Sequence, residues 1–221
     1  MTKSKFWTIT NYTFFSLVII ACLVLTIVLH LDWLAFVSCA ASILYIVFLS
    51  DKNILNFIIG FISSSTYLVV AYKSHLYGEA IFYLVVDIPM IFISFVLWKK
   101  HMETKLKVES KKLSFNNIMF IFVISAIAVV GYGFILKAIG GANTFVDALS
   151  TVVTLVATIL MALRYREQWI MWIVVYVVSV VLWSTTFDLL MLIMSCSCLL
   201  SSIVGFIYWS KSAKVEESVN E

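Results

Sequence analysis

Residues 14–29 read FFSLVIIACLVLTIVL, a stretch that carries no charge and is apolar at almost every position. Such a run supplies most of one membrane-spanning helix. Similar runs recur along the chain, so that 63% of the 221 residues are apolar and only 12% are charged. A soluble domain is about half apolar and about a quarter charged. The composition therefore argues against a soluble protein and predicts a chain that crosses a membrane several times.

Inside a bilayer, backbone N–H and C=O groups must be hydrogen-bonded within the protein, which leaves helix bundles and closed barrels. Barrel strands alternate over about ten residues, whereas the apolar runs here approach twenty. We therefore predict an all-α polytopic membrane protein with eight transmembrane helices. The first run follows two lysines, as a signal peptide would, but lacks a clear small-residue cleavage site, so we expect it to span. The expected spans are 12–29, 33–50, 54–72, 78–98, 115–136, 144–163, 168–184 and 187–209.

The basic residues predict an orientation, because cytoplasmic loops carry an excess of Lys and Arg. With both ends of the chain in the cytoplasm, 13 basic residues lie inside and only 2, Lys73 and Lys137, lie outside. With seven spans instead of eight, the basic residues would no longer gather on one side of the membrane. The inside set is Lys3, Lys5, Lys52, Lys99, Lys100, Lys105, Lys107, Lys111, Lys112, Arg164, Arg166, Lys211 and Lys214.

The spans fall into two similar blocks. Residues 33–98 and 144–209 each hold three expected spans and each end in tryptophan, Trp98 and Trp209. An odd span between them makes both blocks enter the membrane from the same face, which is the parallel repeat that some transporters use. We therefore expect a 3+1+3 core preceded by one extra helix. The expected units are 1–32, 33–98, 99–143 (a Lys-rich cytoplasmic loop and a linker helix), 144–209 and a cytoplasmic tail, 210–221.

Four of the expected spans carry polar or aromatic stripes at helical spacing. Stripes that meet would line a wet cavity able to stack on a flat ring and to hydrogen-bond a polyol. Two plainer interpretations compete with this one, since tryptophans near span ends form an aromatic belt and Ser or Thr often bonds its own helix. The stripes are Asn56, Gly60, Ser63 and Tyr67; Glu79, Tyr83 and Asp87; Asp147, Thr151, Thr154 and Thr158; and Trp169, Trp172, Tyr176, Ser179 and Trp183.

Asp87 lies near the middle of its expected span. A charged carboxylate there costs about 2.5–3.5 kcal/mol, so such acids are usually functional. A protonated carboxyl bonded to a neighbouring helix is the alternative. Pro89, two residues later, is expected to kink the span and free backbone carbonyls.

Enzymatic chemistry finds no support in the sequence. The three histidines are scattered in loops or at span ends, and metalloprotease, P-loop and nucleophile-elbow motifs are absent. The four cysteines lie in apolar runs without zinc-type spacing. We therefore expect no enzyme, no metal site, no cofactor and no nucleic-acid partner.

The segment Phe145–Trp183 resembles the PnuC family of bacterial vitamin transporters. The resemblance rests on Asp147-Ala148, Ile159-Leu160-Met161, Tyr165 and the E-x-W-x-x-W pattern of Glu167, Trp169 and Trp172. Asn56, Gly60, the run Leu76-Tyr77-Gly78-Glu79 and Trp98 match upstream. The resemblance implies a fold related to the SWEET sugar transporters. It also implies uptake of nicotinamide riboside by facilitated diffusion across the bacterial inner membrane, with trapping by a cytoplasmic kinase.

Our hypothesis of a nicotinamide riboside carrier gives roles to individual residues. Trp169, Trp172 and Tyr176 would stack on the pyridinium ring or shape its pocket, and Gln168, Asn56 and Thr151 would bond the ribose or carboxamide. Asp87 or Asp147 would offset the charge of the ring. Tyr176 and Tyr83 depart from the family pattern, where a polar residue such as asparagine and, in some members, glutamine are expected. The complete predicted set is Trp169, Trp172, Tyr176, Gln168, Asn56, Tyr83, Asp87, Asp147, Thr151 and Trp183.

Three alternatives remain open on the sequence. The substrate could be thiamine or another vitamin, since thiamine is also cationic and aromatic. The chain could be a proton-coupled carrier that uses Asp87. It could also be a scaffold or receptor that transports nothing, although polar stripes would then have no purpose. The expected partners are a small vitamin and the lipid bilayer, and a homo-oligomer is possible.

Overall fold

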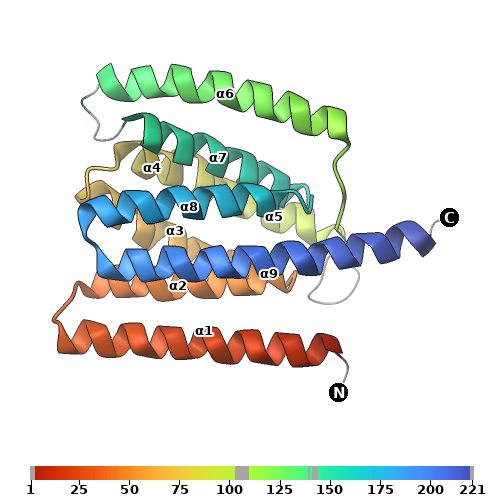
Figure 1. Ribbon diagram of the computed structural model, residues 1–221, viewed down its shortest axis with the longest axis horizontal. Helices are drawn as coiled ribbons and strands as arrows, with labels where there is room; N and C mark the ends of the chain where they lie inside the picture. Colours follow the sequence, from red (N-terminus) through yellow and green to blue (C-terminus); the bar gives the residue numbers. More distant parts are fainter. Residues whose placement is uncertain (1–2, 103–109, 139, 141–143, 220–221) are drawn as a thin grey trace.

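The computed structural model describes residues 3–102, 110–138, 140 and 144–219; for residues 3–11 and 211–219 it describes the helical backbone only. The described chain is helical, as predicted (Figure 1). Residues 103–109 of the predicted Lys-rich loop and residues 1–2 and 220–221 of the predicted tails lie outside the described residues. The elements are α1 (Lys3–Val28), α2 (Trp33–Ser50), α3 (Asn56–Lys73), α4 (Tyr77–Phe82), η1 (Tyr83–Asp87), α5 (Ile88–Lys99), α6 (Phe115–Ala138), α7 (Thr144–Ala162), α8 (Gln168–Thr186) and α9 (Leu189–Val219).

Among the described residues, six helices are long and apolar enough to cross a membrane, and Tyr12–Val28 is a shorter apolar helix. The short elements α4, η1 and α5 run on without a break and count as one of the six, Tyr77–Lys99. The other five are Trp33–Ser50, Phe115–Ala138, Thr144–Ala162, Gln168–Thr186 and Leu189–Ser210.

Helix α9 continues through the predicted cytoplasmic tail, residues 210–221, as far as Val219. Residues 210–219 contain no glycine or proline. Nothing in the local sequence therefore stops the helix at the last apolar residue.

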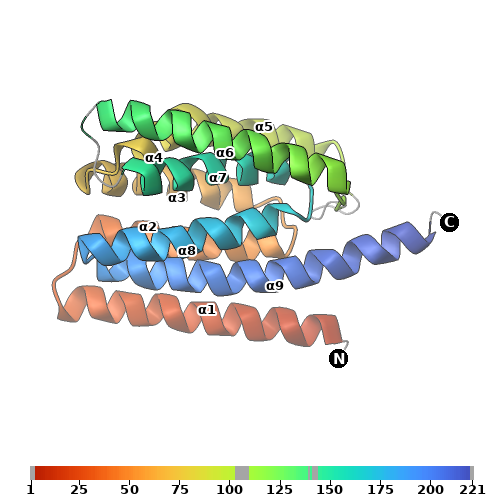
Figure 2. The ribbon, with the colours of Figure 1, turned by 45° about the horizontal axis from the view of Figure 1, so that its top comes forward.

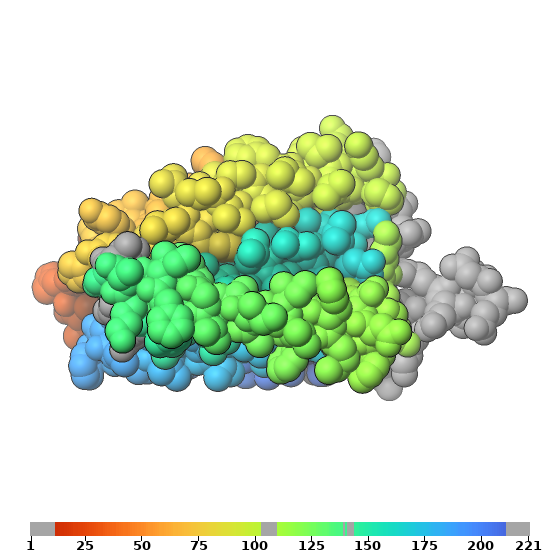
Figure 3. Space-filling view, turned by 90° about the horizontal axis from the view of Figure 1, so that it is seen from above, coloured from red at the N-terminus to blue at the C-terminus, as the bar shows by residue number. Residues whose placement is uncertain are grey.

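Six helical rods form a closed ring, where a rod is one helix or the continuous run α4–η1–α5. Going round it, α2 packs against α3, α3 against α4 and α5, these against α7, α7 against α8, α8 against α9, and α9 against α2 again. Two helices stand outside the ring, since α1 packs on α2 and α9 and α6 packs on α7 (Figures 1 and 2). Figure 3 shows α6 lying along one face of the molecule, with α7 visible beside it. Large apolar side chains are exposed on the outer surface of the molecule, and many polar side chains are buried inside it.

The turns after α2 and α7 are built alike. Each turn contains one non-glycine residue in the left-handed conformation, Lys52 (φ 57°) and Arg164 (φ 65°). The turns after α3 and α8 repeat this device with His75 (φ 60°) and Phe187 (φ 58°). A left-handed residue ends a helix by turning the chain away from its axis. The turns after α2 and α7, and those after α3 and α8, therefore end their helices in the same way.

Two tryptophans tie the halves together at one end of the ring. Trp98 of α5 donates its indole N–H to the carbonyl of Met161 near the end of α7 (3.0 Å). Trp209 of α9 donates in the same way to Ser50 at the end of α2 (3.1 Å). The two indoles also pack on each other, with ring centroids 6.1 Å apart. Each half therefore closes on the first helix of the other.

Candidate functional site

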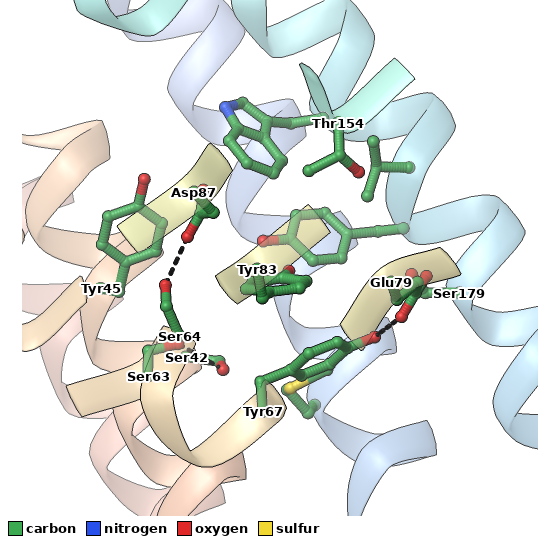
Figure 4. Close-up of a pocket in the computed structure, with 14 residues that line it drawn as sticks. Ser42, Tyr45, Ser63, Ser64, Tyr67, Glu79, Tyr83, Asp87, Thr154 and Ser179 are labelled. Atoms are coloured by element: carbon green, nitrogen blue, oxygen red, sulfur yellow. Dashed lines mark hydrogen bonds between the residues drawn. The ribbon is translucent and has the colours of Figure 1, made fainter. Parts of the chain in front are cut away.

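A polar cavity lies at the centre of the ring, and all six rods contribute to its wall (Figure 4). Its volume is about 30 Å³, which admits one or two water molecules. Sites for small organic ligands are about tenfold larger or more, so such a ligand enters only if side chains move apart. The wall consists of Ser42, Tyr45, Ser63, Ser64, Tyr67, Glu79, Tyr83, Asp87, Thr154, Trp172, Val175, Tyr176, Ser179 and Met194.

Asp87 reaches the cavity from an irregular turn. Residues Tyr83–Asp87 form a π-helical turn, in which the N–H of Ile88 bonds the carbonyl of Tyr83. Such turns within α-helices are frequent at functional sites. Pro89 has no N–H to donate, which leaves the carbonyl four residues earlier without its α-helical partner. Where the sequence predicts a kink at Pro89, the structure has this π turn.

The Asp87 carboxylate has a hydroxyl partner. Ser64 of α3 donates a hydrogen bond of 2.5 Å to Asp87 Oδ2 (Figure 4). Asp87 is 7% exposed, and among the described residues no Lys, Arg or His lines the cavity. The acid therefore sits inside the helix bundle with a hydroxyl donor and no cation in the cavity wall.

Glu79 forms the centre of a second buried network. Tyr67 donates to Glu79 Oε2 (2.5 Å), and Ser150 of α7 donates to Glu79 Oε1 (2.6 Å). Trp183 of α8 in turn donates its indole N–H to the Tyr67 hydroxyl (3.2 Å). Three rods of the ring are thus joined through one carboxylate, both of whose oxygens already accept a hydrogen bond.

Aromatic rings form another part of the wall. Trp172 and Tyr176, one turn apart on α8, stack with centroids 5.9 Å apart and planes at 22°. In another part of the wall, the ring centroids of Tyr67 and Tyr83 are 4.6 Å apart. The indole N–H of Trp172 is buried and has no hydrogen-bond partner among the described residues. A flat ligand could therefore stack on aromatic rings here and accept a hydrogen bond from the Trp172 indole N–H.

Four of the ten predicted site residues, Trp172, Tyr176, Tyr83 and Asp87, line the cavity. The other six are buried but do not line it, and their role stays a prediction. Asn56 donates to the Asn53 carbonyl (2.6 Å), Asp147 accepts from the Gly78 N–H (3.0 Å), and Trp183 bonds Tyr67. Gln168 and Asn56 are the first residues of α8 and α3. Thr151 lies on α7, and Trp169 lies on α8 against Trp209 (5.9 Å).

Five lining residues were missed by the sequence analysis. The spacing of Ser38, Ser42 and Tyr45 indicates a polar face on α2. This pattern could have identified Ser42 and Tyr45 from the sequence. Ser64 lies in a run of three serines, in which periodicity cannot single out one. Val175 and Met194 are apolar residues in apolar spans, so only the tertiary structure identifies them. The missed residues are Ser42, Tyr45, Ser64, Val175 and Met194.

The three residues of the E-x-W-x-x-W pattern make three separate contacts. Glu167 accepts the backbone N–H of Leu113 (3.0 Å) and so anchors the segment that leads into α6. That segment also pairs with the α7–α8 turn through Lys111, whose N–H bonds the Arg164 carbonyl (2.8 Å). Trp169 packs at the end of the ring, and Trp172 reaches the cavity.

Comparison with known proteins identifies the family. A family model described as nicotinamide mononucleotide transporter matches residues 32–211. A nicotinamide riboside transporter PnuC of Neisseria mucosa is 36% identical over 195 residues, covering 83% of this chain and 74% of the relative. The chain belongs to the PnuC transporter family. A PnuC of Haemophilus influenzae, also called a nicotinamide riboside transporter, is 36% identical over 186 residues, covering 83% of this chain and 81% of the relative.

A solved PnuC structure has the same fold. The crystal structure of the vitamin B3 transporter PnuC superposes with a TM-score of 0.85 at 32% identity, covering 93% of this chain and 92% of that one. The PnuC resemblance expected from the sequence is confirmed, and so is the expectation of a multi-pass membrane transporter rather than an enzyme. Helix α1 precedes the region that the PnuC family model matches.

Proposed function

We propose that this PnuC protein imports nicotinamide riboside through the central cavity by facilitated diffusion. The observation that carries the proposal is the composition of the cavity wall. It combines stacked aromatic faces, hydroxyl groups and carboxylates, and the part of the chain that the structure describes contributes no Lys, Arg or His to it. A nicotinamide ring is flat and cationic, and its ribose carries hydroxyls. Each chemical group of the riboside thus has a counterpart in the wall.

The charge of the wall favours the riboside over the mononucleotide. The family description names nicotinamide mononucleotide, whereas both relatives are named for the riboside. The two compounds differ by a phosphate, which proteins bind with Arg, Lys or helix N-termini. Asp87 and Glu79 would repel a phosphate, and no cation in the wall offsets them.

We place the pyridinium ring against Trp172 and Tyr176 of α8, where two nearly parallel rings already stack. Ser42, Ser63, Thr154 and Ser179 would hydrogen-bond the ribose hydroxyls, since all four line the cavity. We further propose that Gln168, Asn56, Thr151, Trp169, Asp147 and Trp183 meet the solute as it passes. For Gln168, Asn56, Thr151, Trp169 and Asp147, this is supported by buried polar atoms that lack a partner among the described residues.

We propose that the membrane topology has eight spans, with α1 and α3 added to the six helices that satisfy length and hydropathy. The two triplets, α2 to α5 and α7 to α9, would form a parallel repeat in a SWEET-like 3+1+3 arrangement, joined by α6. The reciprocal bonds of Trp98 and Trp209 support this repeat. Both termini would lie in the cytoplasm of a bacterial cell, where a kinase would trap the riboside.

The test of the function is riboside binding and uptake by the wild type and by Trp172→Ala. A cation over an indole face contributes about 0.5–2 kcal/mol, so we expect affinity to fall by about 2- to 30-fold. Trp33→Ala is the matched control, because Trp33 lies on the outer surface of α2. Binding is measured by calorimetry on purified protein, and uptake of labelled riboside is measured in proteoliposomes.

Two outcomes would contradict the proposal. If wild-type protein neither binds riboside nor imports it into vesicles, the transport function is wrong. If thiamine binds more tightly than riboside in the same calorimeter, the substrate is the other cationic vitamin. Unchanged affinity in Trp172→Ala would remove the stacking role alone.

A further inference from the structure

The two triplets differ by one residue in their third rods. The rod α4–η1–α5 begins two residues after the left-handed His75, and α9 begins two residues after the left-handed Phe187. Each rod then reaches the tryptophan that bonds the other triplet. Trp98 follows His75 by one residue more than Trp209 follows Phe187. One extra residue is therefore inserted in the first triplet, between two points with matching structural roles.

The extra residue is accommodated in the π turn. A π turn carries one residue more than an α turn, and Tyr83–Asp87 is π-helical whereas α9 is α-helical from Leu189 to Val219. One residue of an α-helix corresponds to about 100° of rotation. The insertion therefore resets which side chains of this rod face the middle of the ring, and Asp87 is one of those that do.

The matching position in the second triplet carries no charge. Counting back equally far from Trp98 and from Trp209 pairs Asp87 with Cys198. Counting equally far from Lys52 and from Arg164 pairs Ser64 with Tyr176. These pairs also correspond in contact, since Ser64 bonds Asp87 and Tyr176 lies beside Cys198. The same pair of positions thus holds an acid in the cavity wall in the first triplet and a buried thiol, which does not line the cavity, in the second.

Asp87, rather than Glu79, is available to a cation. Both Glu79 oxygens already accept hydroxyl donors. The groups that face Asp87 are the hydroxyls of Ser64 from α3, Tyr45 from α2, Tyr83 from η1 and Thr158 from α7. All of these are neutral. An ionised carboxylate at this depth is stabilised most by a cation brought into the cavity.

From the π turn and its broken symmetry, we propose that Asp87 is the charge-selecting residue of the transporter. It recognises the fixed positive charge of the solute ring and discriminates against neutral rings of the same shape. This inference rests on the proposed function, because it assumes that nicotinamide riboside occupies the cavity. It adds that charge, and not shape alone, determines which ribosides bind.

The experiment compares two probes that differ in charge and hardly in shape. Nicotinamide riboside is cationic, and 1,4-dihydronicotinamide riboside is neutral. Binding of each is measured on purified wild type, Asp87→Asn, Asp87→Glu and Asp188→Asn. The last is the matched control, since Asp188 loses the same charge but lies at the start of α9 outside the cavity wall, where it accepts the Met191 N–H.

We expect the wild type and Asp188→Asn to prefer the cation by about tenfold or more, a typical value for one close charge pair. Asp87→Asn should lose that preference while binding the neutral probe within about threefold of wild type. Asp87→Glu should restore most of the preference.

Equal loss of both probes in Asp87→Asn, or an unchanged preference, would overturn the proposal. If that variant does not fold, the wild type alone decides, because equal affinity for the two probes overturns charge selection. Failure of the wild type to bind either probe would instead remove the proposed function and the inference with it.

Discussion

At the scale of single residues, the buried carboxylate of Glu79 depends on hydroxyl donors from other helices. Ser150→Ala would leave Glu79 Oε1 without its 2.6 Å donor. A buried acceptor left without a partner costs about 1–3 kcal/mol, and more if it is charged. We expect the thermal unfolding midpoint in detergent to fall clearly.

Ser184→Ala is the control for this prediction, because Ser184 is exposed and bonds only the Val180 carbonyl of its own helix. Equal midpoints for the two variants would show that the Glu79 network contributes nothing to stability.

Asp32 caps helix α2 outside the membrane. It accepts the backbone N–H of Leu34 (2.9 Å), and Lys73 lies 3.3 Å from its other oxygen. The Leu34 hydrogen bond, helped by Lys73, lowers the pKa of Asp32 below its ordinary value. A lowered pKa means that the stabilisation is complete above the unfolded value, about 3.9, and is lost as the pH falls through the folded value.

Asp32→Ala should therefore cost about 0.5–2 kcal/mol at neutral pH, the usual loss for an N-cap. Asp32→Asn should keep most of the stability, since Asn caps as well as Asp. Its stability should no longer contain the part that the wild type loses when Asp32 is protonated in acid. Unfolding midpoints of both variants at about pH 7 and about pH 3 test this. A wild-type midpoint that falls no further in acid than that of Asp32→Asn would contradict it.

At the scale of helices, α8 and α9 approach closely at Gly205. A Cβ there would lie 2.7 Å from the Trp169 ring. The ring is fully buried and packs on Trp209, so it has no room to shift. We expect Gly205→Ala to destabilise the protein by about 1–3 kcal/mol, as overpacking does.

Gly131→Ala on α6 is the matched control, because nothing lies within 4 Å of a Cβ at that position. Thermal unfolding of both variants is the measurement. A midpoint for Gly205→Ala at or above that of Gly131→Ala would show that the α8–α9 contact can relax.

Helix positions were predictable because apolar run length reflects bilayer thickness. The expected span 33–50 coincides with α2, and 144–163 is within one residue of α7. The π turn was not predictable, since nothing local at Tyr83–Asp87 distinguishes it from an α turn. Pro89 indicated only that the helix would be perturbed nearby.

At the scale of the whole molecule, the ring has two ends that the basic residues distinguish. His75 lies at one end with Lys73, and Lys99 lies at the other. With the positive-inside rule, we expect His75→Cys to react with a membrane-impermeant thiol reagent on intact cells. Lys99→Cys should react only after the membrane is opened. Both positions are exposed, and the wild type is the background control. The reverse pattern would invert the proposed orientation.

The sequence by itself determined that this is an all-helical membrane transporter of the PnuC family. Hydropathy depends on composition over many residues, and the E-x-W-x-x-W segment is a local pattern. Only the tertiary structure decided which polar residues share one cavity. Which side chains of a helix face the cavity depends on how the helix is rotated about its own axis. A single inserted residue near Pro89 changes this rotation. The packing of Trp169 away from the cavity is likewise a matter of tertiary structure. The stripes named candidates on four helices, and the ring brought Asp87, Tyr83, Trp172 and Tyr176 together while placing Asn56 and Gln168 at the helix ends.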